Sequence, residues 1–222
     1  MKRRELLKWS LGAGSAIGVA SLAKAAPLCV GKTPAQTEGP FYPVSDQNDK
    51  DWDLTFVNGN SQKAQGNVIV IAGQVLDQNC KPLPETLVEV WQACATGKYN
   101  HPNDPNKAPL DKNFQYWGRA ATDNHGLYFF KTILPGAYPA DTNWIRPPHV
   151  HYKVHKWGYN ELTTQLYFSG NKYNETDRIL NQIPKSERER VVRPIEIQEI
   201  TLPGEQKAKY PVVRFDIVLT KV

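Results

Sequence analysis

The stretch RPPHVHYKVH, residues 146–155, holds three of the five histidines of this chain. Its apolar and polar side chains alternate, and a period of two residues is typical of a β-strand. His149 and His151 would then lie on one face, about 6.6 Å apart along the backbone, close enough to bind one metal ion. His155 would lie about 13 Å beyond His151, too far to share that ion. Because an H-x-H pair on a strand is by itself more often solvated surface polarity, the interpretation depends on which other ligands are present.

The rest of the chain predicts an all-β fold. Of its 222 residues 40% are hydrophobic, and 17 prolines and 15 glycines indicate many turns. We expect further strands at residues 68–77, 86–93, 161–168, 193–202 and 212–219, a hairpin from 118–123 and 127–133, and one short helix at 175–183. Many short strands with one short helix predict a single β-sandwich domain, residues 27–222, with long loops.

The first 26 residues have the order of an export signal. A charged start with Arg3 and Arg4 precedes an apolar run over residues 9–22 and small residues up to Ala25. The run is too short and glycine-rich to span a bilayer, so no stable membrane insertion is expected. The paired arginines favour the twin-arginine route, with a general secretory signal or a retained anchor as alternatives. We therefore expect cleavage near Ala25 or Ala26 and a periplasmic or secreted protein.

Charge and cysteine content exclude two classes of site. The formal net charge is +5, but residues 1–26 carry five basic and one acidic side chain, so about +1 remains on the mature chain. We therefore expect no nucleic-acid partner. Cys29, Cys80 and Cys94 allow one disulfide and one free thiol in an oxidising compartment, and the pairing stays open. Without a C-x-x-C motif, a cysteine metal site is not expected.

Tyrosine is the surplus donor that could complete a metal site. The histidine strand carries no Asp or Glu that would form a two-histidine, one-carboxylate site. Two of the ten tyrosines precede the histidines at turn edges: Tyr99 in TGKYNHP and Tyr138 in PGAYP. Two anionic phenolate oxygens would suit ferric iron better than zinc or cuprous copper. Each tyrosine alone is more often an aromatic of the core or its rim.

Five segments in this order resemble the intradiol ring-cleavage dioxygenases, most closely the protocatechuate 3,4-dioxygenase branch. They are TEGPFYP (37–43), GKY (97–99), TDNHGLYFFKTILPGAYP (122–139), RPPHVH (146–151) and TTQLYFSG (163–170). The resemblance implies a β-sandwich of immunoglobulin-like or prealbumin-like character that binds non-haem Fe(III) through two tyrosines and two histidines. Matched motif by motif, these ligands fall on Tyr99, Tyr138, His149 and His151, with Tyr138 and His151 axial.

The resemblance also implies the reaction, in which a catechol ring is opened by O2 between its two hydroxyls to a muconate-type diacid. Tyr138 would take a catechol proton, Arg146 would stabilise the developing ring anion, and Gln165 would donate a hydrogen bond nearby. From the residues alone, Arg146 could equally sit in a structural ion pair and Gln165 be a strand-edge amide. Ala140 stands where protocatechuate enzymes carry a tryptophan, so the natural catechol is left open. A complete ligand set in one chain is compatible with a homo-oligomer.

The competing interpretation is a non-catalytic exported β-sandwich module that binds an aromatic or sugar ligand at its surface. It accounts for the six tryptophans and for export. It does not account for the ordered tyrosines and histidines. The iron content per chain separates the two interpretations.

Overall fold

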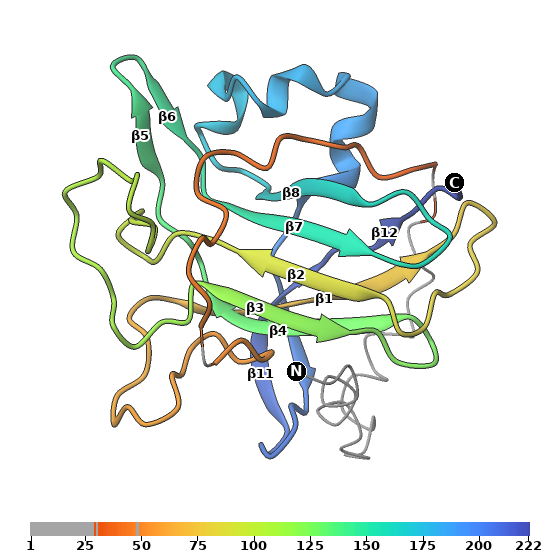
Figure 1. The fold of residues 1–222 in the computed structure, drawn as a ribbon, viewed down its shortest axis with the longest axis horizontal. Helices are drawn as coiled ribbons and strands as arrows, with labels where there is room; N and C mark the ends of the chain where they lie inside the picture. Colours follow the sequence, from red (N-terminus) through yellow and green to blue (C-terminus); the bar gives the residue numbers. More distant parts are fainter. Residues whose placement is uncertain (1–28, 30, 48) are drawn as a thin grey trace.

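The histidine segment forms the central strand of a five-stranded sheet (Figure 1). In this computed structural model, which describes residues 29, 31–47 and 49–222, the alternation of residues 149–155 produces a strand as predicted. The sheet contains, in spatial order, Trp117–Ala121 (β3), Leu87–Trp91 (β2), His149–His155 (β7), Leu162–Phe168 (β8) and Val192–Arg193 (β9). The expected signal peptide, residues 1–26, lies outside the described residues.

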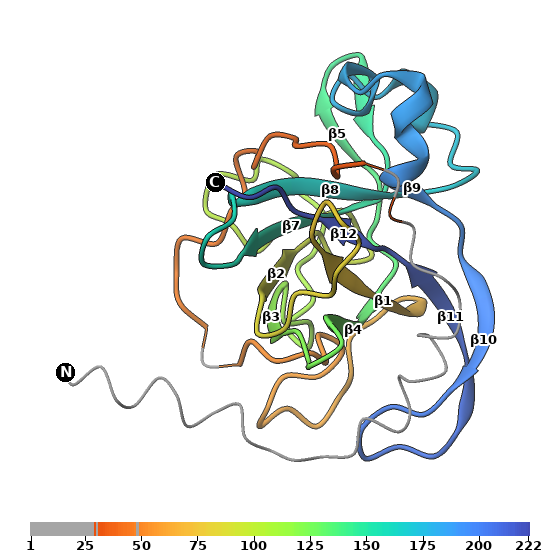
Figure 2. The ribbon, with the colours of Figure 1, turned by 90° about the vertical axis from the view of Figure 1, so that its right-hand side faces the viewer.

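A second five-stranded sheet packs behind the first, and the two layers are seen edge-on in Figure 2. It contains Glu196–Ile200 (β10), Ala208–Arg214 (β11), Val68–Leu76 (β1) and Ile217–Val218 (β12), with Leu127–Ile133 (β4) paired to the other edge of β1. Tyr138–Asp141 (β5) and Trp144–Arg146 (β6) form a separate two-stranded ribbon. The all-β sandwich expected from the sequence is confirmed.

The core lies between the two sheets and explains why β7 has two different faces. Val150, Tyr152 and Val154 have no exposed surface and belong to the main hydrophobic cluster. Burying an aliphatic or aromatic side chain of this size contributes about 1.5–3 kcal/mol. The alternate residues of β7 therefore point out of the sandwich, where His149 and His151 are covered by loops and His155 is exposed.

The expected hairpin at 118–133 is wrong. The turn itself forms, since the amide of Gly126 donates to the carbonyl of Asp123 (2.9 Å), but the flanking strands do not pair. β3 pairs with β2 in one sheet and β4 pairs with β1 in the other. A local turn signal cannot distinguish a hairpin from a crossover between two sheets.

The expected helix at 175–183 is also wrong. The region instead contains three 3₁₀ segments, Asn174–Thr176 (η2), Leu180–Gln182 (η3) and Lys185–Arg190 (η4). Asp177 has extended backbone (φ −72°, ψ 119°), and its Oδ1 accepts the amides of Ile179 (3.2 Å) and Leu180 (2.7 Å). An aspartate that bonds the following amides in this way competes with α-helical hydrogen bonding, which explains the break.

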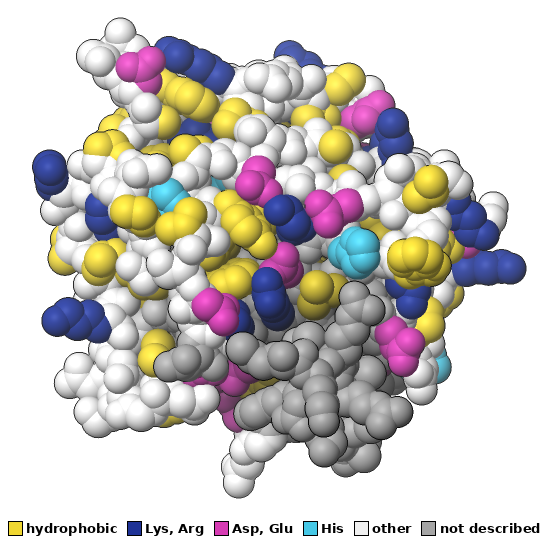
Figure 3. Space-filling view, in the orientation of Figure 1, with side chains coloured by type: hydrophobic (Ala, Val, Ile, Leu, Met, Phe, Trp, Pro, Cys, Tyr) yellow, Lys and Arg dark blue, Asp and Glu magenta, His cyan; other side chains and the backbone are white. Residues whose placement is uncertain are grey.

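One disulfide links Cys29 to Cys80 and leaves Cys94 as a buried free thiol, which resolves the pairing that the sequence left open. Over the described residues, no helix is long and apolar enough to cross a membrane. The outer face of the first sheet carries acidic and basic side chains side by side (Figure 3). Lys153 pairs there with Glu38, and Arg119 pairs with Glu89.

Candidate active site

The register of the first sheet aligns the histidines with other buried side chains on its outer face. His151 lies opposite Trp91 of β2 and Gln165 of β8, and His149 lies opposite Tyr167. The indole of Trp91 stacks on the His151 ring, with centroids 4.8 Å apart and an interplanar angle of 12°. Both histidines are only 2% exposed. Hence they are not part of a solvated strand face, and the first reading of an H-x-H pair does not apply here.

The β5–β6 ribbon brings Tyr138 and Arg146 to the same place. Tyr138 begins β5, Arg146 ends β6, and the two residues are direct partners in the antiparallel register. Only two residues separate Arg146 from His149, so Tyr138 and Arg146 both lie next to the start of β7. Tyr138 is 6% exposed and Arg146 is 3% exposed.

Tyr99 arrives on the loop between β2 and β3, and a glycine lets this loop approach the chain before β5. Gly97 has φ +81°, and a Cβ on it would lie 2.5 Å from the carbonyl oxygen of Ala137. The backbone amide of Tyr99 donates to Oδ2 of Asp104 at 2.7 Å, which holds the end of the loop. Tyr99, at 3% exposed, therefore faces the same point as Tyr138.

The four predicted ligands converge. The Tyr99 hydroxyl lies 3.2 Å from Nε2 of His149, and that nitrogen lies 3.2 Å from Nε2 of His151. Ring centroids of Tyr99 and Tyr138 are 5.5 Å apart, and those of Tyr138 and His149 are 5.7 Å apart. Within the described residues no group of three or more His, Cys, Asp and Glu side chains could hold a metal, whereas two phenols lie beside the two imidazoles.

Hydrogen bonding around the imidazoles suits a cation better than it suits two free rings. Nδ1 of His149 lies 2.7 Å from the carbonyl oxygen of Pro147, which can only accept, so the ring proton is on Nδ1 and Nε2 presents a lone pair. Nδ1 of His151 is buried without a partner among the described atoms. Whichever nitrogen of His151 carries the proton, a buried polar atom is unsatisfied. A metal ion bound by both Nε2 atoms would use the two lone pairs that otherwise face each other at 3.2 Å, although Nδ1 of His151 would still have no partner among the described atoms.

The protonation states of the four side chains also fit a bound cation. Burial, assisted by the nearby Arg146 charge, holds the pKa of both His149 and His151 well below the usual value, so the rings are neutral. Burial raises the pKa of Tyr99 well above 10, and it also raises the pKa of Tyr138, which Arg146 partly offsets. Two neutral imidazoles and two phenols that ionise only beside a cation are a suitable donor set for ferric iron.

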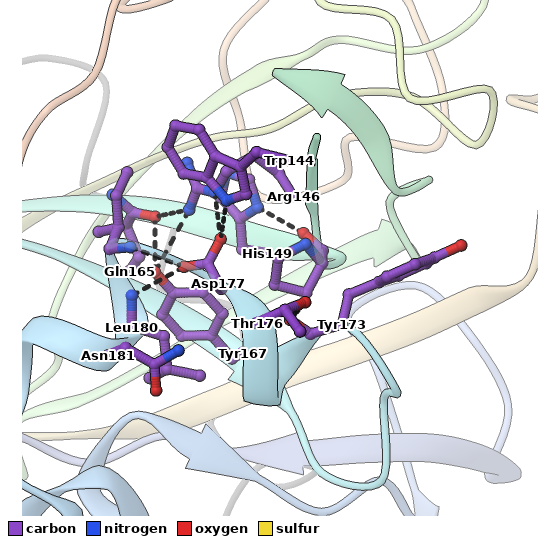
Figure 4. Close-up of polar contacts among 12 residues, drawn as sticks. Trp144, Arg146, His149, Gln165, Tyr167, Tyr173, Thr176, Asp177, Leu180 and Asn181 are labelled. Atoms are coloured by element: carbon purple, nitrogen blue, oxygen red, sulfur yellow. Dashed lines mark hydrogen bonds and ion pairs between the residues drawn. The ribbon is translucent and has the colours of Figure 1, made fainter. Parts of the chain in front are cut away.

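Arg146 sits in a network of hydrogen bonds through its Nε and Nη2 atoms (Figure 4). Its Nε donates to Oδ2 of Asp177 at 2.7 Å, and its Nη2 donates to Oε1 of Gln165 at 2.6 Å and to the Tyr167 hydroxyl at 3.3 Å. Asp177 and Gln165 have no exposed surface. The ion pair considered from the sequence is therefore present. Gln165 is buried, but it lies where β8 pairs with β7 alone, since β9 pairs only with Tyr167 and Phe168, so the strand-edge position considered from the sequence is also found.

The segment 33–47 crosses the outer face of the sheet and covers the site; we call it the strap. The carbonyl of Thr37 accepts a hydrogen bond from Nε2 of Gln165 at 2.9 Å, and Gly39 passes close to the His151 ring. Phe41 packs on Tyr99 with ring centroids 4.8 Å apart. A cavity of about 190 Å³ opens beside Tyr99. The strap lines one part of it, including Phe41 and Val44, and Trp91 and Pro102 lie among its other lining residues.

The comparisons with known proteins agree with this geometry. The family model described as "Dioxygenase" matches residues 37–221. The chain is 39% identical over 183 residues to the protocatechuate 3,4-dioxygenase beta chain of Burkholderia cepacia, covering 81% of this chain and 76% of that one. This chain belongs to the intradiol dioxygenase family.

Other relatives of this dioxygenase place it within the wider family. It is 31% identical over 158 residues to the catechol 1,2-dioxygenase of Acinetobacter baylyi, covering 65% of this chain and 49% of that one. The chain thus spans about half the length of that catechol dioxygenase. The solved catechol 1,2-dioxygenase from Pseudomonas arvilla C-1 superposes with a TM-score of 0.65 at 26% identity, covering 91% and 66% of the two chains. The dioxygenase domain of a carbohydrate-binding fusion from Streptomyces sp. SirexAA-E superposes at 0.59 with 27% identity, covering 86% and 99%.

Sequence reasoning did not anticipate several residues of this dioxygenase that surround the predicted set. The sequence predicts Trp91 only as part of a strand, and no motif marks Asp177 or Trp144 as part of the site. The available signal is that Asp177 stands two residues before the apolar pair Ile179–Leu180, a spacing typical of an aspartate that accepts backbone amides at the start of a helical turn. That signal concerns local structure and does not indicate a partner 31 positions away.

Proposed function

We propose that this chain is a non-haem Fe(III) intradiol dioxygenase that uses O2 to open a catechol ring between its two hydroxyls, giving a muconate-type diacid. The observation that carries the proposal is the buried convergence of Tyr99, Tyr138, His149 and His151 from three separate parts of the chain. These four side chains would hold the iron. When bound, ferric iron would supply a site that chelates the catechol oxygens and draws electron density from the ring.

Tyr138 is proposed as the base that takes one catechol proton at its phenolate oxygen. Burial raises the pKa of the Tyr138 hydroxyl in the chain without a metal, so a Tyr138 phenolate not held by a cation would readily take up a proton. The cavity beside Tyr99 would receive the ring, with Phe41 and Trp91 offering aromatic walls that exclude water. An aromatic substrate of one ring fits such walls by stacking and edge contacts.

Arg146 and Gln165 are proposed to act on the charge that develops in the ring. The guanidinium cannot lose its proton, and it lies directly across the ribbon from Tyr138. A fixed cation in a water-poor site stabilises a developing anion far more than it would in water. Gln165 accepts a hydrogen bond from Arg146 and thereby also helps to orient it.

The visible spectrum of the purified protein tests the ligand set. Two phenolates on one ferric ion should give a broad charge-transfer band, so iron-loaded protein should be coloured. Tyr99→Phe should shift the band and weaken iron binding. Tyr173→Phe, at the residue just before η2 and outside the cluster, is the matched control and should change neither. A colourless protein with one iron per chain would disprove the two-phenolate set.

Oxygen uptake tests the reaction, with catechol, protocatechuate and other substituted catechols as the panel and mass spectrometry of the product. The proposal requires consumption of O2 and a ring-opened diacid. Binding of the catechols without O2 consumption by iron-loaded protein would favour the non-catalytic module instead. The same panel identifies the preferred catechol. A homo-oligomer and the absence of a nucleic-acid partner remain predictions.

We further propose export through the twin-arginine route to the periplasm or the medium. The Cys29–Cys80 disulfide supports this proposal, because disulfides persist mainly in oxidising compartments. Replacing Arg3 and Arg4 by lysines should stop export by this route. Normal export of that variant would instead indicate the general secretory route.

A further inference from the structure

Asp177 makes more contacts than a turn residue needs. Its Oδ2 accepts Nε of Arg146 at 2.7 Å and Nε1 of Trp144 at 3.2 Å. Its Oδ1 accepts the backbone amides of Ile179 and Leu180. One fully buried carboxylate thus joins the β5–β6 ribbon, which carries Tyr138 and Arg146, to the 3₁₀ segments (Figure 4).

The orientation of the guanidinium is set on two of its edges. Asp177 binds Nε, while Gln165 and Tyr167 bind Nη2. In the part of the chain that the structure describes, Nη1 has no hydrogen-bond partner, so it is the nitrogen left to act on another group. A planar fork held on two edges has little freedom to rotate, and its charge keeps one position relative to the four convergent side chains.

A buried guanidinium also needs a counter-ion. Without Asp177 the charge would be left unpaired inside the protein, and Arg146 would move toward water or toward the two phenols. Either movement would displace the charge from the place where, under the proposed function, the ring anion develops. Trp144 packs beside the same carboxylate and restricts the ribbon as well.

We propose that Asp177 is a positioning residue for the ring-cleavage reaction, holding the Arg146 guanidinium in the orientation in which its charge stabilises the reacting anion. This inference rests on the proposed function. Asp177 itself touches neither the four convergent side chains nor the cavity, so it acts through Arg146. The competing role is purely structural, in which Asp177 only caps the turn at residues 179 and 180.

A double-mutant cycle separates the two roles. The variants are Asp177→Asn, Arg146→Leu and the two combined. Asp141→Asn is the control, because Asp141 lies on the same ribbon but forms an ion pair with the exposed Arg178. Measurements on iron-loaded protein are kcat and KM from O2 uptake, and the dissociation constant of catechol without O2. Asp177→Asn should lower kcat about tenfold to a hundredfold, with little change in catechol binding. Asp141→Asn should leave both unchanged.

The decisive comparison is the effect of Asp177→Asn once Arg146 is already leucine. If Asp177 acts through Arg146, kcat should then fall by less than about twofold. An equal loss in both backgrounds would overturn the proposal in favour of the capping role. If Asp177→Asn does not fold, Arg146→Lys replaces it in the test, since lysine keeps the positive charge but lacks the planar guanidinium that Asp177 orients. Wild-type kcat in Arg146→Lys would also overturn the proposal.

A nuclear magnetic resonance measurement makes the inference independent of turnover. The Nε–H signal of Arg146 is recorded on iron-free protein, because paramagnetic Fe(III) would broaden it, and is assigned by its loss in Arg146→Leu. It should be sharp in the wild type and broadened or lost in Asp177→Asn. If wild-type protein does not cleave catechols but this signal still depends on Asp177, the proposed function fails while the positioning is real. If the signal is unchanged in Asp177→Asn, the positioning itself is wrong.

Discussion

Breaking the disulfide by Cys80→Ser should strongly destabilise the protein. Cys29 precedes the strap, and Cys80 lies in the turn after β1, so the bond closes a loop over 51 positions of sequence. That loop contains the whole strap and all of β1. In the unfolded chain the cross-link removes conformations that the serine variant regains.

The loop length determines the size of the effect. For a loop of 51 positions, the chain-entropy relation gives about 4 kcal/mol of stabilisation at 25 °C. The folded state keeps other contacts to this end of the chain, since the amide of Thr33 donates to the carbonyl of Val218 (3.2 Å). We therefore expect the loss to come from the unfolded state, with the fold and the site retained in the variant.

Urea unfolding measures the difference, with and without reductant. Oxidised wild type should be about 3–4 kcal/mol more stable than Cys80→Ser, and reductant should remove this difference. Cys94→Ala is the control: it lacks the buried free thiol, and it should still respond to reductant as the wild type does. A loss below about 1 kcal/mol in Cys80→Ser would refute the loop-closure reasoning.

Two further predictions concern single side chains. Gly97→Ala should lower the free energy of unfolding by about 2 kcal/mol or more and weaken iron binding, because the new Cβ would clash with backbone atoms. Gly158 has the same left-handed φ but lies in open space, so urea unfolding of Gly158→Ala should show a loss of only about 1 kcal/mol. Glu205→Gln should lower the free energy of unfolding by about 1 kcal/mol at pH 7, since the Glu205 carboxylate pairs with the buried Lys131. Although burial opposes it, Lys131 lowers the pKa of Glu205 below 4.5, so this stability is present above pH 4.5 and is lost as the pH falls through the folded value. The unfolding curves of wild type and variant should therefore converge once the pH is below the folded pKa of Glu205, while a difference that persists under acid conditions would contradict the ion pair. Glu199→Gln, in an exposed pair, should show no such loss.

The strand and its two faces could be predicted because the information is local. Alternation over residues 149–155 determines which side chains enter the core, and so His149 and His151 share the opposite face. The two tyrosines could not be placed from the residues alone. Tyr99 lies on a loop and Tyr138 begins β5, and their approach depends on Gly97 meeting the backbone at Ala137. Their place in the set followed from the family resemblance.

The two wrong predictions of secondary structure also have specific causes. The helix expected at 175–183 followed from apolar spacing, but the carboxylate of Asp177 takes amides that an α-helix would use and then turns its other oxygen to Arg146. The hairpin expected at 118–133 followed from a real turn, whose flanking strands belong to different sheets. In both cases a long-range partner outweighed a correct local signal.

The position of β1 has a consequence for how the protein is made. One edge of β1 pairs with β4, and the other pairs in parallel with β11 and β12, so Val70 lies beside Val212 and Leu76 beside Val218. A ribosome has already synthesised β1 when more than a hundred residues of the chain are still to come, and until then this apolar strand has an open edge. Contacts so distant in sequence form slowly and leave such edges free to aggregate. The nascent chain is therefore expected to need protection by chaperones, and truncations that remove residues after about 207 should yield insoluble protein.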